Sequence, residues 1–236
     1  PDAARLRIGF YLDSAALLGR RTAQLPLALA SNAEDPDFAP QLFSEADHQA
    51  FATSALQLLD VNFDLLRRFK AEMPDSARSE ADRVLELEGV ARRRFQLSAR
   101  LKSSATVTRI HGDYHLGQVL FTGKDFIIID FEGEPGFSFS ERRLKKNPYK
   151  DVAGMMRSFH YAAFGKILLN ENYRQQDLEF LEQWGEQWQH YISRFFLHSY
   201  LEKMGYGHTL SQEDDILIRT YLIEKAIYEL GYELNG

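Results

Sequence analysis

Two aspartates and one glutamine near the middle of the chain have the types and the order that phosphoryl transfer requires. Asp113 ends the run His-Gly-Asp, Gln118 follows shortly after it, and Asp130 ends the apolar run Phe-Ile-Ile-Ile-Asp. One carboxylate can accept the proton of an attacking hydroxyl, and a second can hold Mg²⁺ against the phosphates of a nucleotide. An amide oxygen beside the first acid can hold a second Mg²⁺, because this ion prefers hard oxygen ligands. The order of these residues therefore predicts a phosphoryl-transfer site.

Short strands position these residues in a chain that is otherwise helical. Runs of β-branched and aromatic residues predict strands at 106–110, 119–121 and 126–129. The residues Thr-Gly-Lys-Asp between the last two strands predict a hairpin turn. Three short strands do not form a core sheet by themselves. We therefore expect them to present the loop around Asp113 and the strand end at Asp130.

Apolar residues at helical spacing cover most of the remaining chain. They predict helices at 15–30, 44–73, 76–102, 152–169, 175–203 and 212–234. Ser44 and Asp47 resemble a capping box at the start of one helix, and residues 6–12 are strand-like. The predicted class is mainly α with a small β insertion. We divide it into an N-terminal helical part (1–105), a part with catalytic and metal-binding loops on short strands (106–150) and a C-terminal helical part (151–236).

Composition narrows the class of protein further. The 236 residues are 44% hydrophobic and 13% aromatic, which supports a sizeable core and excludes a disordered chain. The formal net charge of −6 disfavours binding to nucleic acid. The lack of cysteine excludes disulfides, thiolate metal sites and cysteine nucleophiles. No apolar run approaches the length of a membrane span and no signal peptide is visible, so we expect a cytoplasmic protein without membrane or nucleic-acid partners.

Several segments carry a resemblance to a known family. His-Gly-Asp, the amide that follows and the run Ile-Ile-Asp-Phe-Glu are similar to the catalytic core of the aminoglycoside-phosphotransferase-like kinases, which are relatives of the protein kinases. HGDYHLGQVLF and IIIDFEGEPG resemble the maltokinases within that superfamily. Three further segments, 19–23, 140–163 and 224–235, also resemble maltokinase segments, so the resemblance runs over nearly the whole chain.

The resemblance implies a function and assigns roles to residues. It implies the C-terminal lobe of a protein-kinase-like fold and ATP-dependent phosphorylation of maltose to maltose 1-phosphate. Asp113 matches the catalytic base, and Asp130 and Gln118 match the Mg²⁺ ligands. His111 matches the structural histidine that begins the catalytic loop. Asp151 is either a helix N-cap or the residue that ties down the catalytic loop, or both, and we expect it to be buried.

A second group of residues is implied to bind the sugar. Glu132 is a candidate for binding a sugar hydroxyl, and Asp113 would contact the hydroxyl that reacts. Lys225, Tyr228 and Tyr232 share one face of the last predicted helix and match family positions that contact the disaccharide. Tyrosines at helical spacing are otherwise ordinary core or rim residues.

The resemblance also implies parts that we do not find in the sequence. A kinase of this kind needs a small N-terminal lobe with a loop over the phosphates and a lysine on a strand. We find neither, so we expect ATP to be bound through a missing lobe and the 236 residues alone to be inactive. Many maltokinases are the C-terminal part of a fusion to trehalose synthase, which leaves such a fused or associated partner open.

The sequence leaves open the acceptor, the presence of catalysis and the role of one basic run. The acceptor can be another sugar, a choline-like alcohol or an aminoglycoside, because Glu132 suits a hydroxyl and an amine alike. The chain can also be a non-catalytic lobe that serves as a binding module. The basic run 142–146 is either a solvated loop or a contact for phosphates or for the missing part of the enzyme.

Overall fold

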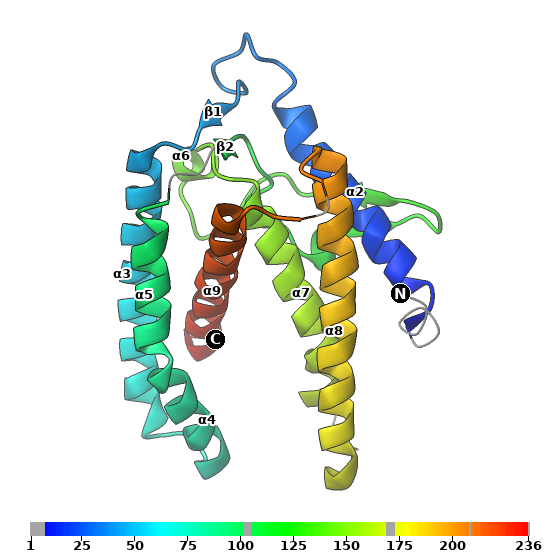
Figure 1. Ribbon diagram of the computed structural model, residues 1–236. Helices are drawn as coiled ribbons and strands as arrows, with labels where there is room; N and C mark the ends of the chain where they lie inside the picture. Colours follow the sequence, from blue (N-terminus) through cyan, green and yellow to red (C-terminus); the bar gives the residue numbers. More distant parts are fainter. Residues whose placement is uncertain (1–7, 102–104, 169–172, 208, 236) are drawn as a thin grey trace. The chain divides into compact units, whose positions relative to one another are not determined.

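Helices dominate the structure. The computed structural model describes residues 8–101, 105–168, 173–207 and 209–235. Within them the strands are short, which confirms the mainly α class with a small β insertion (Figure 1). The chain divides into two compact units: Pro1–Gln41 with Thr106–Ser211, and Leu42–Ala105 with Gln212–Gly236. No helix in the described part is long and apolar enough to cross a membrane.

Long helices form the core of the first unit. They are α2 (Tyr11–Leu29), α7 (Tyr149–Leu168) and α8 (Gln175–Met204), and α8 packs against both of the others. A Cβ atom at Gly19 would lie 2.2 Å from the carbonyl oxygen of Phe196, so the absence of a side chain lets α2 approach α8. Phe196 is fully buried and meets Phe159 edge-on.

The predicted hairpin lies in this unit and is confirmed. β3 (Val119–Phe121) and β4 (Phe126–Ile128) pair antiparallel, with Val119 opposite Ile128. The short 3-10 helix η1 (Leu116–Gln118) leads into β3. The hairpin therefore joins the two loops in which the sequence places the acidic residues.

Other short elements differ from the expectation. The strand expected at 106–110 is shorter, because β2 spans only Thr106–Val107 and the chain then enters the catalytic loop. The irregular segment after the hairpin contains one turn of helix, α6 (Phe139–Arg142), which begins with a capping box between Ser138 and Glu141. β1 (Gln41–Leu42) is the remaining short strand of the described chain.

The second unit packs four helices of the described chain around an apolar core. They are α3 (Glu45–Lys70), α4 (Asp75–Glu86), α5 (Glu88–Ser98) and α9 (Gln212–Asn235). Their shared core consists of Ala55, Leu59, Phe63, Ala91, Phe95 and Ile227. The capping box predicted at Ser44 is confirmed, since the Ser44 hydroxyl accepts from the Asp47 amide and the Asp47 carboxylate accepts from the Ser44 amide.

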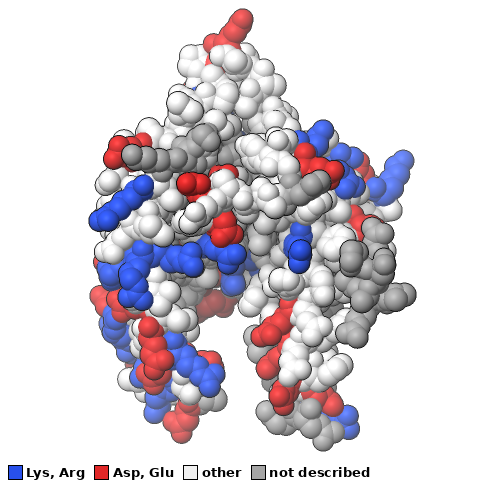
Figure 2. Space-filling view, in the orientation of Figure 1, with Lys and Arg blue, Asp and Glu red and all other residues white. Residues whose placement is uncertain are grey.

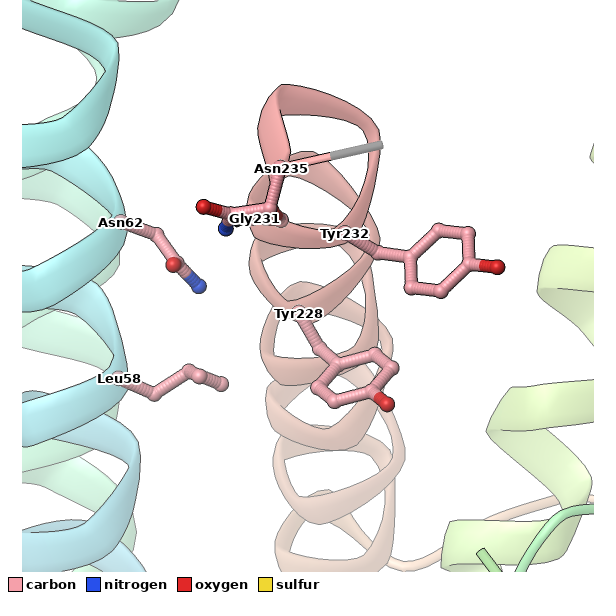
Figure 3. A pocket seen from close by; sticks show the side chains of 6 residues that line it. All are labelled: Leu58, Asn62, Tyr228, Gly231, Tyr232 and Asn235. Carbon is pink, nitrogen blue, oxygen red and sulfur yellow. Dashed lines mark hydrogen bonds between the residues drawn. The ribbon is translucent and has the colours of Figure 1, made fainter. Parts of the chain in front are cut away.

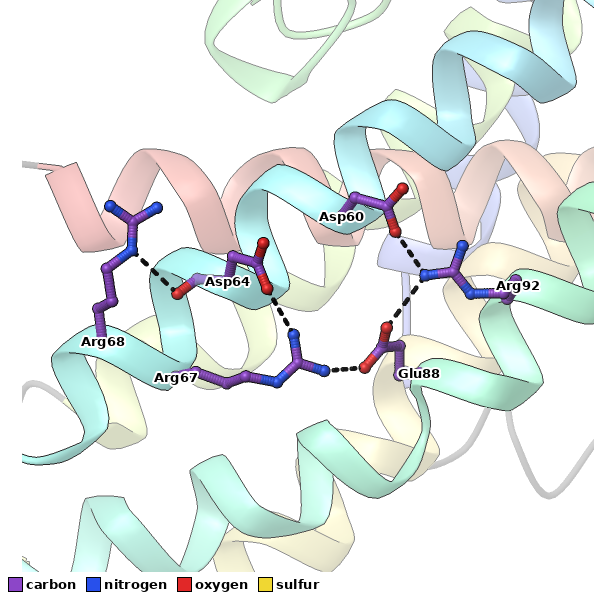
Figure 4. A network of polar contacts seen from close by, with 6 residues as sticks. All are labelled: Asp60, Asp64, Arg67, Arg68, Glu88 and Arg92. Atoms are coloured by element: carbon purple, nitrogen blue, oxygen red, sulfur yellow. Dashed lines mark hydrogen bonds and ion pairs between the residues drawn. The ribbon is translucent and has the colours of Figure 1, made fainter.

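The single long helix expected at 76–102 is wrong. It breaks at Leu87 into α4 and α5, which run in different directions. Gly89 follows the break and lowers the helix propensity there. Glu88 is held by Arg67 of α3 and by Arg92 of α5 (Figure 4). This polar network fixes the start of α5 against α3, so packing decides where the helix breaks.

The strand-like segment 6–12 is also wrong where the structure describes it. Tyr11 and Leu12 open helix α2. Leu12, Ala15 and Leu18 are buried at helical spacing. The segment from Tyr11 on therefore forms a helix with one buried side instead of the expected strand. Residues 6 and 7 lie outside the described residues.

Charge is mixed over the second unit. Lys70 pairs with Asp82, and Arg83 with Glu80. Figure 2 shows acidic and basic side chains lying side by side over α3 and α4. Pairs of this exposed kind contribute little to stability individually.

Candidate active site

A buried carboxylate fixes the loop that carries Asp113. Asp151, in the first turn of α7, accepts a hydrogen bond from the His111 amide at 2.8 Å and one from the Gly112 amide at 3.0 Å. Asp151 is only 5% exposed. Burial raises the pKa of its carboxyl group, and the two amide hydrogen bonds oppose that rise. The start of α7 thus holds two successive peptide groups of the loop.

The His111 side chain connects this loop to the end of β4. Its ring is buried, and its Nε2 lies 2.8 Å from the carbonyl oxygen of Ile129. Its Nδ1 accepts from the Asp113 amide at 3.4 Å. These partners fit the neutral tautomer that carries its proton on Nε2. The imidazole therefore links the residue before Asp130 to the backbone of Asp113.

Two glycines, one in the loop and one in α7, permit the conformation and the packing of the loop backbone. Gly112 has a φ of +87°, a conformation that residues with side chains rarely adopt. A Cβ atom at Gly154 of α7 would lie 2.7 Å from the Tyr114 carbonyl oxygen. Further along, the Tyr114 hydroxyl lies 2.9 Å from Oγ1 of the buried Thr22 on α2, so two helices support the loop.

Asp113 itself is half-buried, and its carboxylate faces a second histidine. His115 Nε2 lies 3.9 Å from Asp113 Oδ2, and His115 Nδ1 accepts from the Gly117 amide. Because Nδ1 is the acceptor, a neutral ring carries its proton on Nε2, on the side of Asp113. The imidazole is therefore a neighbour of the carboxylate, beyond hydrogen-bond distance.

The two predicted metal ligands lie in contact. Gln118 Nε2 donates to Asp130 Oδ2 at 2.8 Å. Asp130 has a φ of +61°, a left-handed conformation that is uncommon for a residue with a side chain. Carboxylate and amide oxygens are ligands that suit Mg²⁺, which keeps other positions for water and substrate phosphates. The convergence of these two side chains therefore fits a magnesium site.

An ion pair anchors the hairpin between these ligands. Arg21 of α2 donates to both carboxylate oxygens of Asp125, at 2.7 and 2.8 Å. The hydrogen bond from Arg21 is the largest cause that lowers the pKa of Asp125 to about 2. Asp125 lies in the turn between β3 and β4, so this contact ties the hairpin to α2.

Glu132 lies two residues beyond Asp130 and is exposed. It lines a cavity of the first unit together with His111 and Phe131. The structure thus places Glu132 at an open surface beside the catalytic loop.

The residues expected to bind sugar on α9 belong to the second unit. Tyr228 and Tyr232 line a cavity of about 380 Å³, and Tyr232 is 71% exposed. Lys225 places its ammonium group 4.6 Å from the centre of the Tyr228 ring. Figure 3 shows both tyrosine rings extending from α9. The exposed Tyr232 ring is therefore accessible to a ligand in this cavity.

Two asparagines of this cavity were missed by sequence reasoning. Asn62 of α3 and Asn235 of α9 line the cavity (Figure 3). Asn62 donates from Nδ2 to the Ile227 carbonyl oxygen at 2.9 Å, and Asn235 donates from Nδ2 to the Gly231 carbonyl oxygen. Each side-chain oxygen remains an acceptor suited to a hydroxyl or an amine. The segment 224–235 pointed to Asn235, whereas no local signal marked Asn62. His115, whose Nε2 lies 3.9 Å from the Asp113 carboxylate, was missed as well.

Comparison with known proteins supports a kinase-like class. A solved structure of glucosamine kinase in complex with glucosamine, ADP and inorganic phosphate superposes with a TM-score of 0.74 at 20% identity, over 95% of this chain and 51% of that chain. Another crystal structure of glucosamine kinase also superposes with a TM-score of 0.74, at 21% identity. At this level of identity the likeness establishes the fold. The molecule thus has the fold of a small-molecule kinase.

The family follows from sequence comparison. The model of the phosphotransferase enzyme family matches residues 11–133, a range that includes Asp113, Gln118 and Asp130. The chain belongs to this family. Curated relatives are the glucosamine kinases of Mycolicibacterium smegmatis, 27% identical over 165 residues, and of Streptacidiphilus jiangxiensis, 27% identical over 160 residues. The matches cover 69% and 66% of this chain but 37% and 31% of those proteins. The chain therefore spans at most about half of the length of the relatives that it matches.

Proposed function

We propose that the chain carries the catalytic part of an ATP-dependent kinase that phosphorylates a hydroxyl group of a small sugar. The observation that carries this proposal is the shared frame of Asp113, Gln118 and Asp130. Asp151 holds the loop of Asp113, His111 joins that loop to the end of β4, and Gln118 contacts Asp130 directly. A base and two metal ligands on one rigid frame are what phosphoryl transfer requires.

In the proposed reaction Asp113 orients the acceptor hydroxyl and accepts its proton. The hydroxyl oxygen forms a bond to the γ-phosphorus of ATP, while the bond from that phosphorus to the bridging oxygen breaks. The products are the sugar phosphate and ADP. The hydrogen bonds of the loop backbone to Asp151 and His111 position Asp113, and positioning accounts for much of the catalysis in reactions of this type.

Gln118 and Asp130 would hold Mg²⁺ in this scheme. The ion would neutralise charge on the phosphates of the nucleotide. When the metal is bound, the contact between the Gln118 amide and the Asp130 carboxylate would be replaced by contacts from their oxygen atoms.

The cavity beside α9 is proposed to take the acceptor. Tyr228 and Tyr232 provide aromatic faces, and Asn62 and Asn235 provide amide oxygens. We favour glucosamine over other acceptors, because the curated relatives are glucosamine kinases. An amide oxygen can accept from the hydroxyl groups and the ammonium group of such a sugar.

Maltose is the second candidate. It is supported by Lys225, Tyr228 and Tyr232, which match the maltokinase positions for the disaccharide and of which the two tyrosines line the cavity. Trehalose synthase as a fused or associated partner belongs with this candidate alone.

Acceptor screening tests the proposal. ATP-dependent phosphorylation of glucosamine, maltose, choline and an aminoglycoside is measured by ADP release, on the 236-residue chain and on the complete gene product. We expect glucosamine to give the highest kcat/KM, and Asp113→Asn to lower it by about 100-fold or more. Asp64→Asn, at an exposed site on α3, is the matched control and should leave kcat/KM unchanged.

Each outcome of the screen has a defined meaning. Preference for maltose would replace glucosamine by the second candidate. An Asp113→Asn variant as active as the wild type would remove Asp113 from the mechanism. A complete gene product that phosphorylates none of the four acceptors would contradict the proposed kinase and favour a binding module.

A further inference from the structure

The cavity of the first unit that Glu132 lines has a volume of about 600 Å³ and lies beside the loop that carries Asp113. Three arginines and three aromatic residues line it: Arg109, Arg142, Arg143, Phe38, Phe131 and Phe139. Phe38 comes from the connector after α2, Arg109 and Phe131 come from before and after the loop and hairpin, and the other three lie in α6 or at its end. The cavity therefore gathers positive charge and exposed aromatic rings in a protein whose net charge is negative.

Two of the arginines converge on one carboxylate of the connector after α2. Arg143 donates to Asp37 Oδ2 at 3.1 Å, and Arg109 lies 3.8 Å from the same oxygen. Arg109 also donates to the Asp37 carbonyl oxygen at 3.1 Å. Asp37 is exposed, with a side-chain accessibility of 61%. The exposed Asp37 carboxylate thus lies beside two guanidinium groups, those of Arg109 and Arg143.

Neighbouring contacts keep the guanidinium groups in place. Arg109 lies over the ring of Phe38 at 5.6 Å, and Arg143 lies over the ring of Phe139 at 5.7 Å. Arg142 donates to the carbonyl oxygens of Phe137 and Pro135, both at 2.8 Å, and so shapes the loop before α6. Donors held in advance lose less side-chain entropy when a ligand binds.

The chemistry of this cavity fits a phosphate group. Guanidinium groups bind phosphate through parallel hydrogen bonds and suit it better than an ammonium group does. Asp37 pairs with Arg109 and Arg143, and Glu132 lines the cavity together with Arg109, Arg142 and Arg143. The charged residues that line the cavity are therefore three arginines and one glutamate.

We propose that this cavity binds a phosphate group, as inorganic phosphate or on a phosphorylated sugar, and that Asp37 pairs with Arg109 and Arg143 when no phosphate is bound. The aromatic rings would pack against a sugar that carries the phosphate. The site adjoins the loop of Asp113, since His111 and Phe131 line it, whereas Asp113, Gln118 and Asp130 are not among its lining residues in the described chain. A cationic acceptor such as glucosamine would be repelled there.

Binding of defined probes tests the site. Inorganic phosphate, glucose 6-phosphate and glucose are titrated into the 236-residue chain at constant ionic strength, by calorimetry and by NMR of the arginine Nε–H groups. We expect saturable binding of both phosphates and none of glucose. Tighter binding of glucose 6-phosphate would assign the site to a sugar phosphate, and equal binding would assign it to inorganic phosphate.

Variants at the site give changes of opposite sign. Arg143→Gln removes a charged donor and should weaken phosphate binding about tenfold or more. Asp37→Asn removes the competing carboxylate and should tighten binding about threefold or more. Arg143→Lys keeps the charge and should retain part of the affinity. If Arg143 had only a structural role, Asp37→Asn would not tighten phosphate binding.

Matched variants on α9 serve as controls. Arg219 pairs with Asp215 on an exposed surface, and neither Arg219→Gln nor Asp215→Asn should change phosphate binding. Circular dichroism checks that each variant is folded. The proposal is overturned if phosphate does not saturate, if Arg143→Gln binds as the wild type does, or if the control variants change affinity equally.

Discussion

Removal of the Asp151 carboxylate tests the frame of the catalytic loop most directly. In Asp151→Ala the amides of His111 and Gly112 lose the acceptor that now lies at 2.8 and 3.0 Å. A buried donor without a partner costs about 1–3 kcal/mol, so two cost about 2–6 kcal/mol. Loss of the buried charge offsets part of this cost. We expect the free energy of unfolding to fall by about 2–4 kcal/mol.

Two measurements separate this effect from a general loss of stability. Denaturant titration gives the free energy of unfolding, and hydrogen exchange followed by NMR gives the protection of the His111 and Gly112 amides. These two amides should lose protection more than amides of α8. Asp151→Asn keeps one side-chain oxygen as an acceptor and should lie between the wild type and the alanine variant.

A control and a refuting result complete this test. Asp64→Ala removes an exposed carboxylate paired with Arg67 and should change stability by less than about 0.5 kcal/mol. If Asp151→Ala loses less than about 1 kcal/mol and both loop amides keep their exchange rates, Asp151 does not hold the catalytic loop.

Two further predictions concern packing and pH. Gly19→Ala places a Cβ atom 2.2 Å from the Phe196 carbonyl oxygen and should lower the free energy of unfolding by about 2–3 kcal/mol. Thermal unfolding compares this variant with Gly165→Ala, whose added Cβ atom meets nothing within 4 Å. Equal unfolding midpoints for the two variants would contradict the prediction. Burial lowers the pKa of His48, so the wild type should lose stability as the pH falls below about 6.5. His48→Phe should lack that loss in denaturant titrations from about pH 8 to 5, and parallel curves for the two proteins would contradict the reasoning.

Local patterns in the sequence were sufficient for most elements of the fold. Apolar spacing placed α3, α7, α8 and α9 close to their observed bounds, and the residues of the turn located the hairpin. The break at Leu87 and the helix at Tyr11 were not found. Both depend on contacts with other helices, namely the pairing of Glu88 with Arg67 and the burial of Leu12.

The candidate site divides in the same way. The order of Asp113, Gln118 and Asp130 along the chain is by itself sufficient to indicate phosphoryl transfer. His115 lies only two residues from Asp113 but was not singled out, and nothing local indicates that Asn62 lies beside α9. A residue type and its spacing limit the chemistry that is available, but the approach of side chains from distant segments depends on packing.

The sequence by itself determined the helical class, the hairpin and the residue types of the transfer site, because these follow from neighbouring residues. Only the tertiary structure decided which groups meet. It brought Asp151 to the catalytic loop, and it brought Arg143 to Asp37 across 106 positions of the chain. The physical reason is that hydrogen bonds and ion pairs act over a few ångströms. Their partners are therefore selected by how the helices pack, which no local pattern records.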